Sequence, residues 1–168
     1  SNGEYLDSMW KGRIPHRSTG YHAKMSFFFA DISRRVSHEL IRNYVGADRD
    51  EEGNPSQEST RFTEFPGIYV VHPAYLEDGD DLESFGADAR DNYERYRQAL
   101  QRKVRRFQLA NEGRMPTGMA RKRIFEACSQ RLLHSVATSF IWTTNPMALV
   151  KLFTERVDEA ADMEMRRF

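Results

Sequence analysis

The sequence predicts a single α+β domain over residues 1–168, in which a mixed sheet packs against long helices. Apolar residues recur every three or four positions in several long segments, which is typical of amphipathic helices. Short runs of aromatic and β-branched residues lie between these segments and indicate strands. With 168 residues and 39% hydrophobic content, the chain is long enough to bury one core. The order of elements shows neither βαβ regularity nor a Gly-rich phosphate loop.

The first third of the chain is predicted to hold one strand and one helix. Residues 1–23 are rich in Gly, Pro, Ser and His, with Thr19 at a turn. Residues 24–30 have the aromatic run of a buried strand, and Asp31 is placed to cap the following helix. That helix carries apolar residues at four-residue spacing, namely Ile32, Val36, Leu40 and Tyr44. An acidic loop containing Gly and Pro is predicted to follow it.

The middle of the chain is predicted to contain a strand, a loop and a helix. The strand lies at about 68–71 and is closed by Pro73, and residues 74–86 are acidic and loop-like. A helix is predicted from about 87 to 111, where Gly113 ends it. Its apolar face consists of Tyr93, Tyr96, Leu100, Val104 and Phe107.

The last third is predicted to form helix, strand and helix. A helix over about 117–134 has an apolar side made of Met119, Ile124, Cys128, Leu132 and Leu133. A strand follows at about 136–144. Asn145 is a good N-cap, and Pro146 suits the first helical position. The closing helix is predicted to turn Leu149, Leu152, Phe153 and Val157 inward.

The composition excludes several classes of protein. Twenty-five basic and 25 acidic residues give a formal net charge of zero, so no global positive field favours nucleic acid. Cys128 is the only cysteine, which excludes an internal disulfide framework and suits a reducing compartment. No apolar run approaches the length that spans a membrane, and no signal-peptide core is visible. We therefore expect a cytoplasmic protein with no membrane partner and no nucleic acid polymer as partner.

Several familiar chemistries have no motif in this sequence. GxGxxG, the P-loop, GxSxG and HExxH are all absent. The five histidines are scattered without metal-ligand spacing, so we assign no metal site. Cys128 lies among apolar neighbours in a predicted helix, where a buried inert thiol is favoured over a nucleophile.

The stretch from Arg35 to Phe62 is the first candidate site. A helix ends near Arg42, an acidic loop follows, and the chain returns with Gln57, Glu58, Ser59, Thr60 and Arg61. Guanidinium and hydroxyl groups supply convergent donors to phosphate oxygens, so this arrangement can hold an anionic group. A solvated loop flanked by surface ion pairs has the same pattern, and spacing alone leaves both interpretations open.

Four motifs together resemble the flavin-dependent thymidylate synthases. They are SHELIRNY at residues 37–44, SQESTRF at 56–62, MPTGMARKR at 115–123, and the segment from Phe140 to Met165. The last is the firmest match, with a strand end before Asn145, a helix with Arg156, and a closing Ala-x-x-Glu-Met. The resemblance covers most of residues 16–167, and the motifs occur in the family's order.

The resemblance implies a reaction, a set of cofactors and an assembly. The family methylates C5 of a uridylate with methylenetetrahydrofolate as carbon donor, and FAD carries the reducing equivalents that NADPH supplies. For this chain it implies a uridine monophosphate substrate, dUMP or UMP, and a folate partner. It also implies a homotetramer with its sites between subunits. The family uses no cysteine nucleophile on the pyrimidine, which agrees with a buried Cys128.

The resemblance also assigns roles to residues. Arg156 matches the catalytic arginine that contacts the pyrimidine, where a fixed cation would stabilise developing negative charge. The residues that match substrate-binding positions are Glu39, Arg42, Gln57, Glu58, Ser59, Thr60, Arg61 and Arg121. The residues that match flavin-contact positions are Thr19, Arg42, Asn43, Tyr44, Asn145, Met147 and Lys151.

Several of these residues have a structural explanation as well. Arg156 can pair with Asp158 or Glu159 at the surface, and Arg42 can serve a helix C-terminus, where the macrodipole favours a cation. Asn145 is explained as an N-cap without any flavin. Arg121 lies in a basic run that is usually a solvated face.

The chain departs from the family pattern mainly at flavin positions. The family's His and second Arg beside the flavin are Asn43 and Tyr44 here, its Gln is Glu39, and its Tyr is Phe62. The Arg of its Asn-Ala-Arg is Met147. Phosphate-binding side chains are retained better than flavin-binding ones. Two explanations follow: methylation of a related nucleotide in a specialised pathway, or a nucleotide-binding or assembly protein without redox chemistry that kept the fold.

Overall fold

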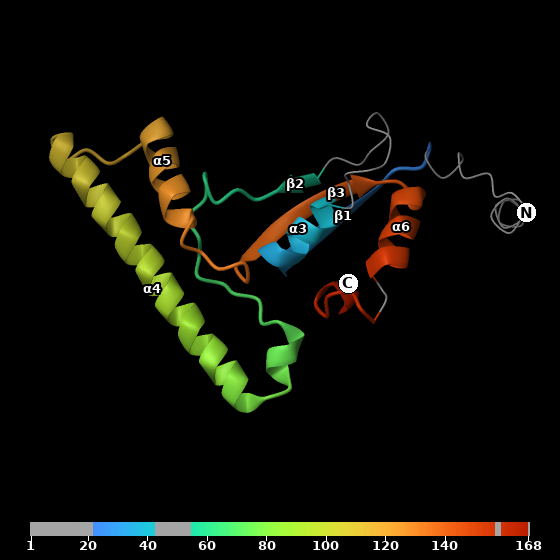
Figure 1. The fold of residues 1–168 in the computed structure, drawn as a ribbon. Coiled ribbons are helices and arrows are strands. Elements are labelled where there is room, and N and C mark those ends of the chain that lie inside the picture. Colours follow the sequence, from blue (N-terminus) through green and yellow to red (C-terminus); the bar gives the residue numbers. More distant parts are fainter. Residues whose placement is uncertain (1–21, 43–54, 157–158, 168) are drawn as a thin grey trace, which may run out of the picture. The chain divides into compact units, whose positions relative to one another are not determined.

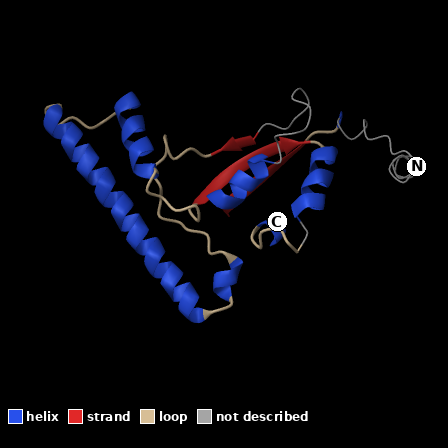
Figure 2. Ribbon diagram, viewed as in Figure 1, coloured by secondary structure: helices blue, strands red, loops and turns tan. Residues whose placement is uncertain are grey.

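The structure is a computed structural model that describes residues 22–42, 55–156 and 159–167. Within these ranges it contains four α-helices, two short 3-10 helices and one three-stranded sheet (Figures 1 and 2). The strands are β1 (Met25–Ser33), β2 (Pro55–Gln57) and β3 (Ala137–Thr144). The helices are α3 (Arg34–Arg42), α4 (Gly79–Ala110), α5 (Gly118–Ser129) and α6 (Pro146–Arg156), with 3-10 turns η1 (Pro73–Leu76) and η2 (Met165–Arg167). This mixture confirms the α+β class.

The sheet has the strand order β1-β3-β2 and is antiparallel, so the prediction of a mixed sheet was wrong. The contacts between β1 and β3 show the direction. Ser26 and Thr143 share a hydrogen bond of 2.8 Å at one end, and the amide of Arg34 donates to Val136 at the other. Strand direction is set by which segments pair in the folded state, and the apolar pattern of a strand does not encode it.

The chain divides into two compact units. Unit 1 comprises residues 1–28, 38–56 and 141–168, and unit 2 comprises residues 29–37 and 57–140. The organisation as one domain therefore stays a prediction. None of the helices in the described ranges is long and apolar enough to cross a bilayer.

The core of unit 2 is built around one aromatic side chain. The ring of Phe65 makes edge-to-face contacts with Tyr69, Tyr93 and Tyr96, with centroids 5.2, 5.9 and 6.0 Å apart. Fully buried Tyr96 also accepts a hydrogen bond from the Phe65 amide. Gly67 passes over this cluster with φ +91°, and a Cβ there would lie 2.9 Å from the Tyr93 ring. Only glycine meets both requirements.

The start of α3 differs from the prediction. Asp31, the predicted cap, belongs to β1 and has φ 54°, a left-handed conformation. Ser33 performs the capping, because its buried Oγ accepts from the amide of Val36 at 3.1 Å. The predicted apolar face is confirmed where it is described, since Ile32, Val36 and Leu40 are all buried. Tyr44 lies outside the described residues.

Helix α4 begins well before the predicted position. The sequence assigned residues 74–86 to a loop, whereas η1 starts at Pro73 and α4 at Gly79. Asp78 is the N-cap, and its carboxylate accepts from the amides of Asp80 and Asp81. Acidic side chains are favoured in a first turn because of the macrodipole. The acidic run that indicated a loop is therefore the start of a 32-residue helix.

Two strand predictions had different outcomes. The strand at 136–144 is confirmed as β3, but the strand at about 68–71 is reduced to one isolated bridge between Tyr69 and Val136. Neighbouring amides do pair there, since Val70 donates to Ser135 and Ala137 donates to Ile68. These bonds lie at the entry to β3 and do not extend into a ladder. The third strand of the sheet is β2, a segment that the sequence assigned to a loop.

The last helices are shorter or more exposed than predicted. Helix α5 ends at Ser129 instead of 134, and its predicted apolar residues Met119 and Leu133 are exposed. Phe153 of α6 was predicted to point inward and is 54% exposed, while Leu152 is buried as predicted. Asn145 caps α6 as predicted, with its Oδ1 accepting from the amide of Ala148 at 2.9 Å.

Candidate functional site

A basic cleft in unit 2 contains two of the predicted phosphate-binding residues. Its volume is about 390 Å³, and it lies between the loop after β2 and the first turn of α5. The lining residues are Arg61, Phe62, Gly118, Met119, Arg121 and Lys122. We call it the anion cleft, because three of these side chains are cations and none is acidic.

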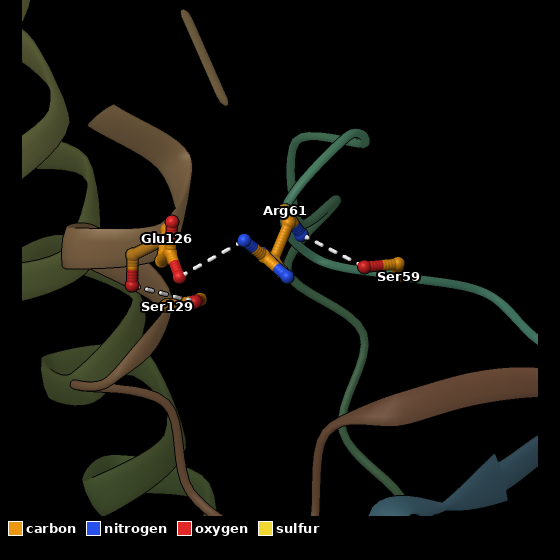
Figure 3. Close-up of polar contacts among 4 residues, drawn as sticks. All are labelled: Ser59, Arg61, Glu126 and Ser129. Carbon is orange, nitrogen blue, oxygen red and sulfur yellow. Dashed lines mark hydrogen bonds and ion pairs between the residues drawn. The ribbon is translucent and has the colours of Figure 1, made fainter. Parts of the chain in front are cut away.

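A tight turn presents Arg61 to the cleft. The amides of Phe62 and Thr63 both donate to the Ser59 carbonyl, at 3.0 and 3.2 Å. The Ser59 hydroxyl accepts from the amide of Arg61 at 3.3 Å, which closes the turn from the inside (Figure 3). The Arg61 side chain then extends from the loop toward α5 (Figure 3).

The three cations of the cleft have weak partners. Arg61 Nη2 lies 3.1 Å from Oε1 of Glu126, and both side chains are nearly half exposed. Lys122 Nζ lies 4.8 Å from the centre of the Phe62 ring, and the Arg121 guanidinium lies 4.9 Å from that of Phe125. Exposed ion pairs and cation–π contacts of this kind contribute about 1 kcal/mol or less. An anionic ligand that binds these cations therefore has to displace only weak contacts.

The first turn of α5 adds a further anion-binding feature. Gly118 opens the helix with φ 50°, and Thr117 occupies the N-cap without a side-chain capping hydrogen bond. The amides of Ala120 and Arg121 donate to the Thr117 carbonyl, at 3.1 and 3.4 Å. The positive end of the helix macrodipole at Gly118 and Met119 lies beside Arg121 and Lys122. Such a terminus combined with arginine forks is an arrangement that suits phosphate.

Three other predicted residues of this loop, Gln57, Glu58 and Thr60, do not line the anion cleft. The amide group of Gln57 donates to Ser37 at 2.6 Å and to Thr138 at 3.4 Å, so it is used inside the fold. Glu58 is exposed, and its backbone joins β3 through the Ser139 carbonyl. Thr60 lines a separate small cavity of about 20 Å³, large enough for one water molecule.

Arg34, the first residue of α3, contacts this loop, and sequence reasoning did not assign it to a site. It lines the same small cavity, and its Nη2 donates to the Glu58 carbonyl at 3.0 Å. Its Nε is buried without a hydrogen-bond partner, and burial lowers the pKa of its guanidinium despite the nearby Glu58 charge. Arg34 thereby holds the chain one residue before Ser59. The sequence showed only that Arg34 belongs to the predicted helix. It gave no indication of the hydrogen bond to Glu58, which lies 24 residues further along the chain.

Phe62, Gly118, Met119 and Lys122 were also not assigned to a site. Phe62 was noticed only as a departure from the family's tyrosine, and Lys122 only as part of a basic run. The available signal was the order Gly118, Met119, Ala120, Arg121, Lys122, in which a glycine at a helix start precedes two cations.

Unit 1 joins two predicted residues that are far apart in sequence. Arg156 Nη2 on α6 lies 3.0 Å from Oε2 of Glu39 on α3, and both side chains are about 70% buried. The Nε of Arg156 is buried with no hydrogen-bond partner. The sequence offered Asp158 or Glu159 as surface partners of Arg156. Among the described residues the structure gives it Glu39, and Asp158 lies outside them. The pair is shielded from solvent, so its charges are screened less than those of an exposed pair.

Three of the predicted flavin-contact residues lie at α6: Asn145 directly precedes the helix, and Met147 and Lys151 lie within it. Asn145 is buried and committed to capping, Met147 is half-buried, and Lys151 is exposed with Glu155 at 4.0 Å. Thr19, Asn43 and Tyr44 lie outside the described residues. Arg42 is the last residue of α3, and its side chain is likewise outside the description.

Two other chemistries were tested on the described residues. No group of three His, Cys, Asp or Glu side chains able to hold a metal ion occurs among them. Cys128 is fully buried, and burial raises the pKa of its thiol although Lys103, Arg131 and Arg102 act in the opposite direction. A thiol in this state is not an activated nucleophile, as predicted.

Comparison with known proteins gives a consistent result. A family model described as "Thymidylate synthase complementing protein" matches residues 1–168. A flavin-dependent thymidylate synthase of Mycobacterium sp. (strain JLS) is 29% identical over 168 residues, covering 99% of this chain and 63% of the relative. Proteins of the same name from Mycobacterium avium (strain 104) and Mycobacterium leprae (strain TN) are 30% and 28% identical, covering 92% of this chain and 58% of each relative. The chain thus spans about three fifths of the length of these relatives.

Proposed function

Because the chain belongs to the family of thymidylate synthase complementing proteins, the flavin-dependent thymidylate synthases, we propose that it methylates C5 of a uridine monophosphate. The substrate is dUMP or UMP, and methylenetetrahydrofolate supplies the carbon. Reduced FAD supplies the hydride, and NADPH reduces the flavin. The single observation that supports nucleotide binding most is the anion cleft, where Arg61, Arg121 and Lys122 line one cavity.

In this proposal the nucleotide phosphate binds in the anion cleft. Arg61 and Arg121 offer planar guanidinium forks, and Lys122 adds a point charge. Ser59 and Thr60 lie on the same loop as Arg61 and are proposed to contact the phosphate through their hydroxyls, although Thr60 lines the separate small cavity in the structure. The Phe62 ring, 62% exposed, offers an apolar surface at the rim of the cleft. A cavity of about 390 Å³ has the size of a small-molecule site.

Arg156 is the proposed catalytic residue. Its guanidinium would stabilise negative charge that develops on the pyrimidine during attack by C5. In the structure Glu39 neutralises that guanidinium at 3.0 Å. A ligand that accepts a hydrogen bond from the unpartnered Nε of Arg156 would use the positive charge while the contact to Glu39 stays in place. The buried carboxylate would then remain paired. Glu39 and Arg42 are proposed to contact the nucleotide beside it.

The proposed flavin contacts fit FAD in part. Lys151 is exposed and only loosely paired with Glu155, so its ammonium can bind a phosphate of the cofactor. Asn145 and Met147 lie within the first turn of the same helix, beside its positive end. Thr19, Arg42, Asn43 and Tyr44 complete the proposed set. When bound, FAD accepts and returns the reducing equivalents that the methylation consumes. A homotetramer with sites between subunits is part of the same proposal.

A second candidate function is nucleotide binding or assembly without redox chemistry. It is favoured by one observation: every residue of the anion cleft belongs to unit 2, while the described flavin candidates belong to unit 1. Anion binding therefore needs no flavin-contact residue. The replacement of the family's His and Arg by Asn43 and Tyr44 points in the same direction.

An absorbance spectrum of the purified protein separates the two functions. The protein is supplied with FAD, washed, and then titrated with dUMP and with UMP. A visible flavin band that shifts with one of the nucleotides supports the methylase proposal and identifies its substrate. A colourless protein that still binds a uridylate supports the non-redox function. A protein that binds neither FAD nor a uridylate contradicts both.

A further inference from the structure

A second cavity in unit 2 has a composition that the proposed function does not use. It lies between the second half of α4 and the end of α5, and its volume is about 540 Å³. Helix α5 lies beside that half of α4 (Figure 1). The lining residues are Ala99, Arg102, Lys103, Arg106, Ala127 and Arg131. We call it the α4–α5 pocket.

The α4–α5 pocket is distinct from the anion cleft. The two cavities share no lining residue. Both use α5, but Ala127 lies five residues after Lys122, which places it about 140° further around a helix with 3.6 residues per turn. The two cavities therefore open on different faces of α5.

The cations of the α4–α5 pocket have no partners in the described part of the chain. No ion pair, side-chain hydrogen bond or ring contact involves the charged ends of Arg102, Lys103, Arg106 or Arg131 there. Earlier in the same helix the situation differs, because Arg95 pairs with Asp91 at 2.7 Å and Arg97 lies over the Tyr93 ring. The pocket also has no acidic lining residue.

The helix macrodipole does not account for this cluster. Its effect is confined to the last turn of a helix, and the last turn of α4 contains no basic residue. It can explain Arg131, which follows the C-cap Gln130 of α5. The three cations of α4 that line the pocket are exposed to solvent, and the macrodipole does not favour their position.

Three of the four cations also act on one group beneath the pocket, the thiol of Cys128. Burial raises the pKa of the Cys128 thiol, and Lys103, Arg131 and Arg102 each oppose that rise. Cys128 neighbours the lining residue Ala127 and packs in the core with Ala99. Charges from α4 and from the end of α5 thus lie close enough to act on the same thiol, and an anion bound among them would be attracted by all of them.

The lining defines the chemistry of the ligand. It has no aromatic ring on which a nucleobase could stack, and its uncharged residues are two alanines. Guanidinium and ammonium groups bind carboxylate and phosphate oxygens, and four of them match several negative charges. We propose that the α4–α5 pocket is a binding site for a small oligoanion, a chain of phosphates or of carboxylates that carries three or more negative charges.

The test is a calorimetric titration of the full chain with two probes, inorganic tripolyphosphate and a triglutamate peptide. We expect at least one probe to bind, with an affinity that falls as salt is added. Arg106→Gln should weaken binding about tenfold or more, the loss expected for a charged hydrogen bond. Arg105→Gln is the matched control, because it removes the same charge from the neighbouring residue, which does not line the pocket.

The results separate this site from the nucleotide site and from other anion sources. Binding of the probe must persist in Arg121→Ala, a variant that disables the anion cleft but leaves the α4–α5 pocket unchanged. The test therefore stays valid even if the uridylate proposal fails. Preference for tripolyphosphate or for triglutamate would identify the phosphate or the carboxylate source. The proposal is overturned if neither probe binds, or if Arg106→Gln and Arg105→Gln have equal effects. Binding of a DNA duplex but of neither probe would also overturn it.

Discussion

At the scale of single residues, Arg61 has a competitor for any anionic ligand. Its guanidinium lies 3.1 Å from the carboxylate of Glu126, and both groups are partly exposed to water (Figure 3). A phosphate that binds Arg61 has to displace this carboxylate or tolerate it. The carboxylate also places a negative charge near the incoming phosphate. Glu126 therefore weakens the cleft for anions even though it orders the arginine.

We predict that Glu126→Gln tightens uridylate binding. An exposed ion pair is worth up to about 1 kcal/mol, so its removal should improve affinity by up to about fivefold. Isothermal titration with dUMP and UMP measures the change. Glu112→Gln is the matched control, because it removes the same charge from an exposed ion pair with Arg114 that does not line the cleft. Weaker binding in Glu126→Gln would mean that this carboxylate positions Arg61 for the ligand.

At the scale of elements, the N-terminus of α4 depends on one side chain. Asp78 accepts hydrogen bonds from the amides of Asp80 and Asp81 and is the cap of a 32-residue helix. We predict that Asp78→Ala lowers the free energy of unfolding by about 1 kcal/mol. Urea denaturation of the purified chain measures this loss. Asp88→Ala, an exposed change inside the same helix, should alter the free energy by less than about 0.5 kcal/mol.

The same helix shows what sequence patterns can and cannot predict. The apolar period predicted a helix at about 87–111, which covers most of α4, and the Asn145-Pro146 pair predicted the start of α6, because each signal is local. The run of acidic residues at 77–81 was interpreted as a loop, although Asp, Glu and a capping carboxylate also suit a first turn. A charged run alone does not distinguish the two, because the deciding hydrogen bonds form only with the helix.

Contacts between distant elements were beyond the reach of these patterns. The pairing of β2 with β3, the bond from Arg34 to Glu58, and the pair of Arg156 with Glu39 each join residues many positions apart. The family resemblance identified Arg61 and Arg121 as candidates, and the structure places both at one cleft. Lys122 was missed because nothing in a basic run indicates which of its members faces a cavity, and Phe62 was noticed only as a departure from the family's tyrosine.

At the scale of the whole molecule, the stability of the chain should depend on pH at the alkaline end. Burial, with a smaller contribution from Tyr93, raises the pKa of Tyr69 to about 12 from its ordinary value of 10.0. Burial raises the pKa of Tyr96 as well. A group whose pKa is raised on folding stabilises the protein fully below its unfolded pKa. That stabilisation is lost as pH rises toward the folded pKa.

We therefore predict that the free energy of unfolding falls between about pH 10 and about pH 12. Urea denaturation across this range measures the slope. Tyr69→Phe should flatten the slope, because it removes one of the titrating hydroxyls. It should also cost about 1 kcal/mol at neutral pH, because Tyr69 donates a 2.8 Å hydrogen bond to Asn92. A slope that is unchanged in Tyr69→Phe would contradict the assignment to this tyrosine.

The distribution of charge also belongs to this scale. A formal net charge of zero argued against a strongly basic protein. Unit 2 nevertheless concentrates cations at two cavities, the anion cleft and the α4–α5 pocket, neither of which has an acidic lining residue. The net charge of a chain describes its electrostatic field at long range, but it does not show where charges gather into local sites. Both proposals for this chain depend on that local segregation.

The central claim is that a uridylate phosphate binds in the anion cleft, and titration of two neighbouring arginine variants tests it most directly. The wild-type chain, Arg121→Ala and Arg123→Ala are each titrated with dUMP and with UMP. Arg121 lines the cleft and Arg123 does not, although the two lie on the same helix and carry the same charge. We predict that Arg121→Ala weakens binding at least tenfold, whereas Arg123→Ala changes it less than about twofold. Equal losses in the two variants, or no binding of either nucleotide by the wild-type chain, would contradict the claim.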